Sequence, residues 1–205
     1  MDFNLYIAQF AGISIMLPAA LVIAGWLWSA ASRKVAFLWL SVLLFVYCVV
    51  GLSKVLFKGW GIASENLNIA VLSGHATNAC LVFTVMLSLL LRQLDQRLRW
   101  PALVLGLLAS WWFSVNYIVP MMHPLPEAIA GGLLGSAAAC IFLFRLEEEG
   151  IGKISCRALV MGSAVILACS LAPKLTAEGL LDQIATSLSG AGHAFKRPHW
   201  RNVPG

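Results

Sequence analysis

Hydrophobic residues run through this chain in long unbroken blocks, and charged residues are confined to the stretches between the blocks. Asp, Glu, Lys and Arg are absent from residues 3–32, 35–53, 66–91 and 100–126, and residues 128–144 and 158–173 form shorter blocks of the same kind. A helix that crosses the hydrocarbon core of a bilayer needs about 20 apolar residues. The pattern therefore predicts an all-α polytopic membrane protein with six transmembrane helices, at residues 5–30, 35–57, 72–92, 101–121, 125–145 and 157–173.

The composition supports a membrane-integrated chain. Of its 205 residues, 60% are hydrophobic and 11% are charged, and a soluble core of this size cannot bury so much apolar surface. The first block does not read as a cleavable signal peptide, because Asp2 precedes it and the basic pair Arg33-Lys34 follows it. We expect a transmembrane domain over residues 1–175 and a basic-aromatic tail over residues 176–205.

The five cysteines lie in or beside apolar blocks without a Cys-x-x-Cys spacing. Cysteine commonly serves as a small hydrophobic residue in such surroundings. We therefore expect no disulfide, no metal site and no cofactor.

Basic residues in the short connections indicate an orientation. They follow the first, third and fifth predicted helices: Arg33, Lys34, Arg92, Arg97, Arg99, Arg145, Lys153 and Arg157. Short loops rich in Lys and Arg face the cytoplasm, so both termini are expected to be extracytoplasmic, in what we expect to be a bacterial inner membrane. The net charge of +5 then reflects topology and anionic lipid headgroups, and does not indicate nucleic-acid binding.

A Ser-Gly-His triplet opens the third predicted helix. Ser73 suits the N-cap, Gly74 permits close approach to the backbone, and His75 stands in the first turn. Exposed N–H groups at a helix N-terminus attract anions, and His75 could donate a proton to an oxygen bound there. The alternative is a capped helix whose histidine is hydrated among the headgroups.

A histidine and a carboxylate lie four residues apart at the start of the fifth predicted helix, after a Pro-rich turn. Glu127 could accept the imidazole N–H of His123, fix its tautomer and raise its nucleophilicity. The alternative is a loop histidine and a glutamate that reaches toward the headgroups. The small residues Gly131 and Gly135 predict close helix packing behind this pair.

Two lysines lie at the same predicted face of the membrane, at the end of the second helix. Lys54 and Lys58 are one turn apart and could neutralise an anion held at Ser73 and Gly74. The alternative is that both lysines simply extend toward the lipid headgroups.

In this order along the chain, the three stretches resemble the type 2 phosphatidic acid phosphatase (PAP2) superfamily over residues 54–135. That family has a lysine leading to Arg-Pro, then Pro-Ser-Gly-His, then Ser-Arg followed by histidine and aspartate. This chain has Gly61 where the first arginine is expected, Leu72 for the proline, and Asn116-Tyr117 for Ser-Arg. Asn116 and Tyr117 are therefore candidate replacements at a lost arginine position.

The resemblance implies a six-helix fold with an extracytoplasmic site that hydrolyses a lipid phosphate or diphosphate without a metal. The substrate would be of the phosphatidic acid, phosphatidylglycerol phosphate or isoprenyl diphosphate type. By this likeness His123 would form a phosphohistidine, Glu127 would orient it and His75 would protonate the leaving oxygen. The phosphoryl oxygens would be held by Lys54, Ser73 and Gly74, with Lys58 nearby.

Other functions remain open at this point. The chain could be a phosphotransferase that uses the same intermediate, or a non-catalytic relative that binds a lipid phosphate or serves as a partner subunit. A six-helix transporter is less well supported, because no charged residue lies at a helix midpoint. The tail could lie on anionic headgroups, or Arg197 or Arg201 could fold over the site. The pattern does not indicate an oligomeric state.

Overall fold

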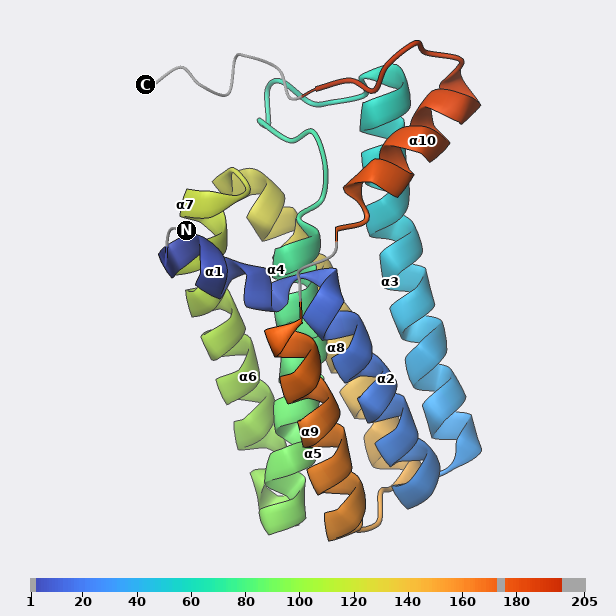
Figure 1. Ribbon diagram of the computed structural model, residues 1–205. Coiled ribbons are helices and arrows are strands. Elements are labelled where there is room, and N and C mark those ends of the chain that lie inside the picture. The colour runs from blue at the N-terminus through green and yellow to red at the C-terminus, as the bar shows by residue number, and fades with distance from the viewer. Residues whose placement is uncertain (1–2, 173–175, 197–205) are drawn as a thin grey trace.

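The computed structural model describes residues 3–172 and 176–196, and within these ranges the fold is all-helical (Figure 1). The segments η2 and η4 are single π-helical turns, and η1 and η3 are 3₁₀ turns. The elements in chain order are α1 (Phe3–Ala8), η1 (Gln9–Ala11), α2 (Ile13–Ala30), α3 (Arg33–Trp60), α4 (Gly74–Asn78), η2 (Ala79–Phe83), α5 (Thr84–Leu94), η3 (Gln96–Leu98), α6 (Arg99–Phe113), η4 (Ser114–Ile118), α7 (Val119–Met121), α8 (Leu125–Glu149), α9 (Cys156–Leu171) and α10 (Glu178–Ser189).

Among the described residues, five helical stretches are long and apolar enough to cross a membrane. They are Phe3–Ala30, Arg33–Trp60, Gly74–Leu94, Gln96–Met121 and Leu125–Glu149. These stretches agree with the first five predicted helices to within about a turn at most ends, and they make the chain a membrane-integrated protein.

The sixth predicted helix, 157–173, corresponds to α9, which has 16 residues. At 1.5 Å per residue α9 is about 24 Å long, which is shorter than the hydrocarbon core of about 30 Å. The predicted end at residue 173 lies outside the described residues. In the described part of the chain, helix length thus allows five crossings, and the sixth stays a prediction.

The first predicted helix, 5–30, is interrupted. Gly12 has extended backbone geometry (φ −70°, ψ 158°) between η1 and α2, and α1 lies across the end of the bundle instead of continuing α2 (Figure 1). A Cβ atom at Gly12 would lie 2.9 Å from the Gln9 carbonyl oxygen and 3.5 Å from His75 Nε2. This bend brings the N-terminal segment against the start of α4.

The core is packed differently at the two ends of α8. At one end large rings fill the space, since Trp39 and Phe142 are fully buried with ring centroids 5.0 Å apart. At the other end glycines allow close backbone approach: a Cβ at Gly131 or Gly135 would lie 2.4 Å from the carbonyl oxygen of Ser73 or Thr77. The predicted small-residue face is thus confirmed as a packing surface for α4.

The basic connections gather at one end of the bundle, as the sequence predicts. The α2–α3, α5–α6 and α8–α9 turns lie together there, and the 61–73 loop and the α7–α8 turn lie at the opposite end (Figure 1). Acidic residues at the end of α8 pair with this basic group: Glu147 with Arg92 and Arg99, and Glu149 with Lys34 at 2.6 Å.

Candidate functional site

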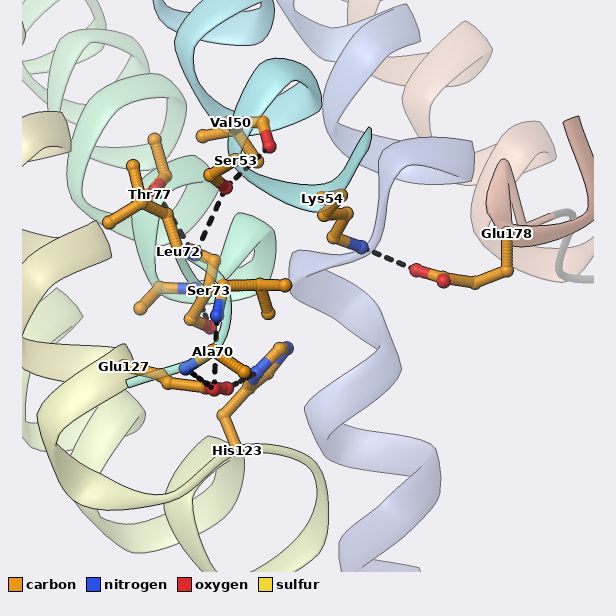
Figure 2. Close-up of polar contacts among 12 residues, drawn as sticks. Val50, Ser53, Lys54, Ala70, Leu72, Ser73, Thr77, His123, Glu127 and Glu178 are labelled. Atoms are coloured by element: carbon orange, nitrogen blue, oxygen red, sulfur yellow. Dashed lines mark hydrogen bonds and ion pairs between the residues drawn. The ribbon is translucent and has the colours of Figure 1, made fainter. Parts of the chain in front are cut away.

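The centre of the site is a buried histidine–carboxylate pair at the start of α8. His123 is 7% exposed and Glu127 is fully buried. His123 Nδ1 lies 2.9 Å from Glu127 Oε2, while Glu127 Oε1 accepts hydrogen bonds from the backbone N–H groups of Ala70 (2.9 Å) and Val71 (3.2 Å) (Figure 2). Three nitrogen atoms thus surround the carboxylate, an arrangement that stabilises a buried negative charge.

The loop before α4 is tied to two helices. The Ser73 N–H donates to the main-chain carbonyl of Glu127 at 3.2 Å, and the Leu72 N–H donates to Ser53 Oγ of α3 at 3.1 Å. Ser73 Oγ accepts from the Ala76 N–H at 3.3 Å, which confirms Ser73 as the N-cap. These contacts fix where α4 begins and therefore where His75 stands.

His75 and His123 face each other although 48 positions separate them in the sequence. Their ring centroids are 6.1 Å apart, with an angle of 50° between the planes. The two histidines therefore lie at the same end of the bundle. Both rings line a cavity of about 740 Å³, here called the polar cavity.

The polar cavity is lined by residues of both signs and a few apolar side chains. Its polar members are Lys54, Lys58, His75, His123, Glu178, Asp182, His193 and Lys196. A second cavity of about 310 Å³, here called the side cavity, shares Lys54, His75, Met122 and Glu178 with it. The side cavity extends between α2, α3 and α10; its surface is mainly apolar, with contributions from Ile13, Val50 and Leu181.

Three of the four phosphate-binding residues expected from the sequence line these cavities, and the fourth does not. Lys54 lines both cavities, Lys58 lines the polar cavity and Gly74 lines the side cavity. Ser73 is fully buried and does not belong to the described lining of either cavity. Its hydroxyl shapes the helix start on which Gly74 and His75 lie.

Both lysines are paired with carboxylates of α10. Lys54 binds Glu178; Lys58 binds Glu178 Oε2 at 2.8 Å and also binds Asp182 (Figure 2 shows the Lys54–Glu178 pair). Burial raises the pKa of Glu178, but hydrogen bonds from Lys54 and Lys58 outweigh it and lower the pKa from 4.5 to about 2. The carboxylate is therefore charged throughout the physiological pH range.

Sequence reasoning missed these two acids because residues 176–205 read as a basic-aromatic tail. The signal that could have found them is spacing. Lys54 and Lys58 are four residues apart, and so are Glu178 and Asp182, so each pair lies on one face of its helix and the two faces can meet.

Asn116 and Tyr117 lie apart from the polar groups of the site. Asn116 is exposed and its Nδ2 donates to the carbonyl of Trp112 at 2.8 Å. The Tyr117 ring packs against Trp112 and Phe113 at centroid distances of 5.7 and 5.4 Å. Neither residue belongs to the described lining of the two cavities, so their role as arginine replacements gains no support from position.

The tail turns back over the end of α3. The Phe195 N–H donates to the Lys58 carbonyl at 2.8 Å, and the Phe195 ring lies against Gly61, where a Cβ would be 3.2 Å from it. Gly61 caps α3 in the left-handed conformation (φ 68°). Arg197 and Arg201 lie outside the described residues, and Lys196 and His193 line the polar cavity.

Within residues 3–172 and 176–196, no group of three or more His, Cys, Asp or Glu side chains could hold a metal ion. The five cysteines are free thiols. The titratable groups that line the polar cavity are imidazoles, carboxylates and ammonium groups.

Comparison with known proteins gives one full-length likeness. The chain is similar to a Klebsiella pneumoniae protein described as an uncharacterized 22.5 kDa protein in cps region, with 29% identity over 201 residues that cover 93% of this chain and 94% of the relative. No protein-family model matches the chain, and no solved structure matches it.

Proposed function

We propose that this chain is a membrane phosphatase of the PAP2 type, which hydrolyses a lipid phosphate or diphosphate through a phosphohistidine on His123. The observation that carries the proposal is the pairing of His123 with the buried Glu127 carboxylate, opposite His75, in a cavity that also holds Lys54 and Lys58. A nucleophile, the group that orients it and a candidate proton donor therefore occupy one site.

The His123–Glu127 contact sets the chemistry of the imidazole. A carboxylate that accepts a hydrogen bond from the Nδ1–H group holds the ring in the tautomer whose lone pair is on Nε2, and it stabilises the cation that forms when Nε2 becomes bonded to phosphorus. Glu127 is itself positioned by the N–H groups of Ala70 and Val71. His123 is thus oriented before a substrate binds.

The reaction has two steps. In the first, His123 Nε2 attacks phosphorus, the N–P bond forms, the bond from phosphorus to the lipid oxygen breaks, and protonated His75 gives its proton to that oxygen. In the second, neutral His75 takes a proton from water, the resulting hydroxide attacks phosphorus, and the N–P bond breaks to release phosphate. His75 ends the cycle protonated and His123 ends it free.

The separation of the histidines suits an in-line displacement. With a nucleophile about 3 Å from phosphorus, a P–O bond of about 1.6 Å and an acid about 3 Å from the leaving oxygen, the two reacting nitrogens lie on the order of 7–8 Å apart. The ring centroids of His75 and His123 are 6.1 Å apart. Since each ring nitrogen lies about 1 Å from its ring centroid, this separation is compatible with the proposed assignment of nucleophile and acid.

The surroundings are consistent with a lipid substrate. Lys54 and Lys58 would bind the phosphoryl oxygens, and the Gly74 backbone would contribute the N-terminal end of α4. The apolar side cavity meets the polar cavity at Lys54 and His75, so a lipid chain could extend between the helices. We also propose that α9 completes a sixth crossing, that the site is extracytoplasmic, and that the host membrane is a bacterial inner membrane.

A non-catalytic lipid-phosphate-binding protein is the second candidate. Both lysines are already paired with carboxylates, and Glu127 has a structural task in holding the 70–73 loop. Gly61, where the resembling family has arginine, is a helix cap against Phe195 and offers no cation. A phosphotransferase would use the same intermediate and differ only in the acceptor.

Phosphate release by the purified protein tests the proposal. We expect release from at least one of phosphatidic acid, phosphatidylglycerol phosphate and an isoprenyl diphosphate, with a loss of about 10²-fold or more in His75→Ala. Ser187→Ala, at an exposed position of α10 that lines neither cavity in the described part of the chain, is the control and should keep wild-type turnover. Wild-type protein that binds a lipid phosphate without releasing phosphate would support the non-catalytic candidate.

A further inference from the structure

Three lysines line the polar cavity in the described part of the chain, and α10 neutralises two of them. Lys54 binds Glu178, and Lys58 binds both Glu178 and Asp182, so two positive charges meet two negative charges. The third lysine, Lys196, is exposed and forms no ion pair among the described residues. Lys196 therefore supplies the lysine charge of the described lining that no carboxylate offsets.

Contacts of the preceding residue hold the tail against the end of α3. The Phe195 N–H donates to the Lys58 carbonyl at 2.8 Å, so the tail backbone lies against the last turn of α3. The Phe195 ring lies against Gly61, where a Cβ atom would be 3.2 Å from the ring. Gly61 has φ 68°, a conformation that favours glycine and leaves this surface open to the ring. Lys196 is thus placed at the cavity by contacts that do not involve its own side chain.

The charge balance decides which lysine attracts an arriving anion. A phosphomonoester carries about −1.5 to −2 at neutral pH. At Lys54 and Lys58 the attraction to the ammonium groups is opposed by repulsion from Glu178 and Asp182. Lys196 attracts the same anion without an opposing carboxylate and without first losing a partner. The attraction is modest because the side chain is exposed, and it weakens as salt screens the charge.

We infer that Lys196 is a further phosphate-binding residue, which the tail brings to the polar cavity. Its ligand is a terminal phosphoryl group, either on a lipid headgroup or free as inorganic phosphate. The contribution is to affinity, since an exposed ammonium group responds to the charge of the anion and not to the lipid that carries it. This inference rests on the proposed function, because it adds a residue to the site that contains His75 and His123.

The test is the affinity for two anions, measured by isothermal titration calorimetry on the full-length protein in detergent. The probes are inorganic phosphate and a short-chain phosphonate analogue of phosphatidic acid, whose P–C bond resists hydrolysis. At low salt, Lys196→Gln should raise the dissociation constants by about two- to fivefold. The rise should largely disappear at about 1 M salt, where the screening length is about 3 Å. Lys196→Arg, which keeps the charge, should retain the wild-type constants.

The two probes distinguish the source of the phosphoryl group. Rises of similar size for both indicate a contact with the phosphoryl group itself. A rise for one probe alone identifies its source, the lipid headgroup or the free ion, as the ligand of Lys196. Constants that do not rise at low salt, or that rise equally at low and high salt, would overturn the inference, because an exposed charge must be sensitive to screening.

Lys153→Gln is the matched control. Lys153 is an exposed lysine in the connection between α8 and α9, at the opposite end of the bundle, and it lines neither cavity in the described part of the chain (Figure 1). Its removal changes the net charge of the protein by the same amount as Lys196→Gln. Both dissociation constants should equal those of wild type.

Phe195→Ala tests how Lys196 is positioned. Loss of the ring contact with Gly61 should raise the dissociation constants by no more than Lys196→Gln does, because the tail is less firmly held. The same substitution should have no further effect in Lys196→Gln protein, since the charge that the ring positions is already absent. An effect of equal size in both backgrounds would refute the positioning role of Phe195.

Turnover of phosphatidic acid, measured in parallel, separates the binding role from the proposed function. Phosphate release by wild type, with wild-type constants in Lys196→Gln, would refute the binding role alone. Raised constants in a protein that releases no phosphate would refute catalysis and leave the binding role standing. A wild-type protein that neither binds the probes nor releases phosphate would contradict both.

Discussion

The two carboxylate oxygens of Glu127 form hydrogen bonds with two different parts of the site. Oε2 holds the His123 ring, and Oε1 holds the backbone of Ala70 and Val71 in the loop that leads to His75. A carboxylate within a membrane-spanning segment is costly unless it is fully paired. The same side chain therefore positions both proposed reacting histidines, and its removal should affect stability as well as turnover.

Glu127→Gln should reduce phosphate release by about 10²-fold or more and also lower the unfolding temperature. Glutamine keeps the shape but has one acceptor oxygen, so either the imidazole or the loop N–H groups lose their partner, at a cost of about 1–3 kcal/mol. His123→Asn is the comparison, because an asparagine amide can replace Nδ1 against Glu127. It should abolish release with a smaller thermal shift. Equal thermal shifts in the two variants would contradict the double role.

At this scale the sequence indicated the candidate reacting groups and one pairing, but not the contacts that hold them. Spacing alone paired His123 with Glu127, since a residue just before a helix can reach one in its first turn; His123 lies two residues before α8 begins at Leu125. The contacts from Ala70 and Val71 to Glu127 depend on how the 61–73 loop folds over α8. Loop geometry of this kind has no periodic pattern, so tertiary contacts decide it.

Close contact between α4 and α8 positions the site at the scale of elements. Gly131 and Gly135 allow the two backbones to approach, and Thr77 Oγ1 donates to the Gly131 carbonyl at 3.0 Å. His75 is on α4 and Glu127 is on α8. The distance between the proposed catalytic groups therefore depends on residues that bear no functional group.

Gly131→Ala should destabilise the protein by about 1–3 kcal/mol or more, because its methyl group would lie 2.4 Å from the Ser73 carbonyl oxygen. The substitution should also reduce turnover by moving α4 away from α8. Gly25→Ala is the control, since nothing lies within 4 Å of a Cβ at Gly25, and alanine there should be neutral or slightly stabilising. Thermal unfolding in detergent measures both. A Gly131→Ala protein as stable as wild type would refute this packing account.

The sequence predicted long helices well and short ones poorly. Apolar blocks determine the crossings, so the range 125–145 was close to Leu125–Glu149. The break at Gly12 and the helix α10 were not predicted. Glycine alone does not end a helical pattern, and α10 is a 12-residue amphipathic helix whose stability comes from packing on α3.

At the scale of the whole molecule, the site and the basic connections lie at opposite ends of the bundle (Figure 1). If the basic end faces the cytoplasm, the polar cavity opens on the extracytoplasmic side. The helical arrangement fixes which loops share an end, but orientation in a membrane depends on the charge distribution of those loops. A direct labelling experiment is therefore needed.

In a chain whose five cysteines are replaced by alanine, a single cysteine at Asn66 should react with a membrane-impermeant reagent added to intact spheroplasts. A cysteine at Gln96, in the connection between α5 and α6, should react only after the membrane is permeabilised. Asn66 lies in the loop at the site end, and Gln96 lies at the basic end. The reverse labelling pattern would place the site in the cytoplasm.

The proposed mechanism requires His123 to become covalently bonded to phosphorus. Purified protein is mixed with phosphatidic acid or an isoprenyl diphosphate labelled with ³²P in the terminal phosphate, and the reaction is quenched in alkali within milliseconds to seconds. An acid-labile, alkali-stable label is expected on the peptide that contains His123, retained in Ser187→Ala and absent in His123→Asn. Phosphate release without such a label, or release that persists in His123→Asn, would contradict it.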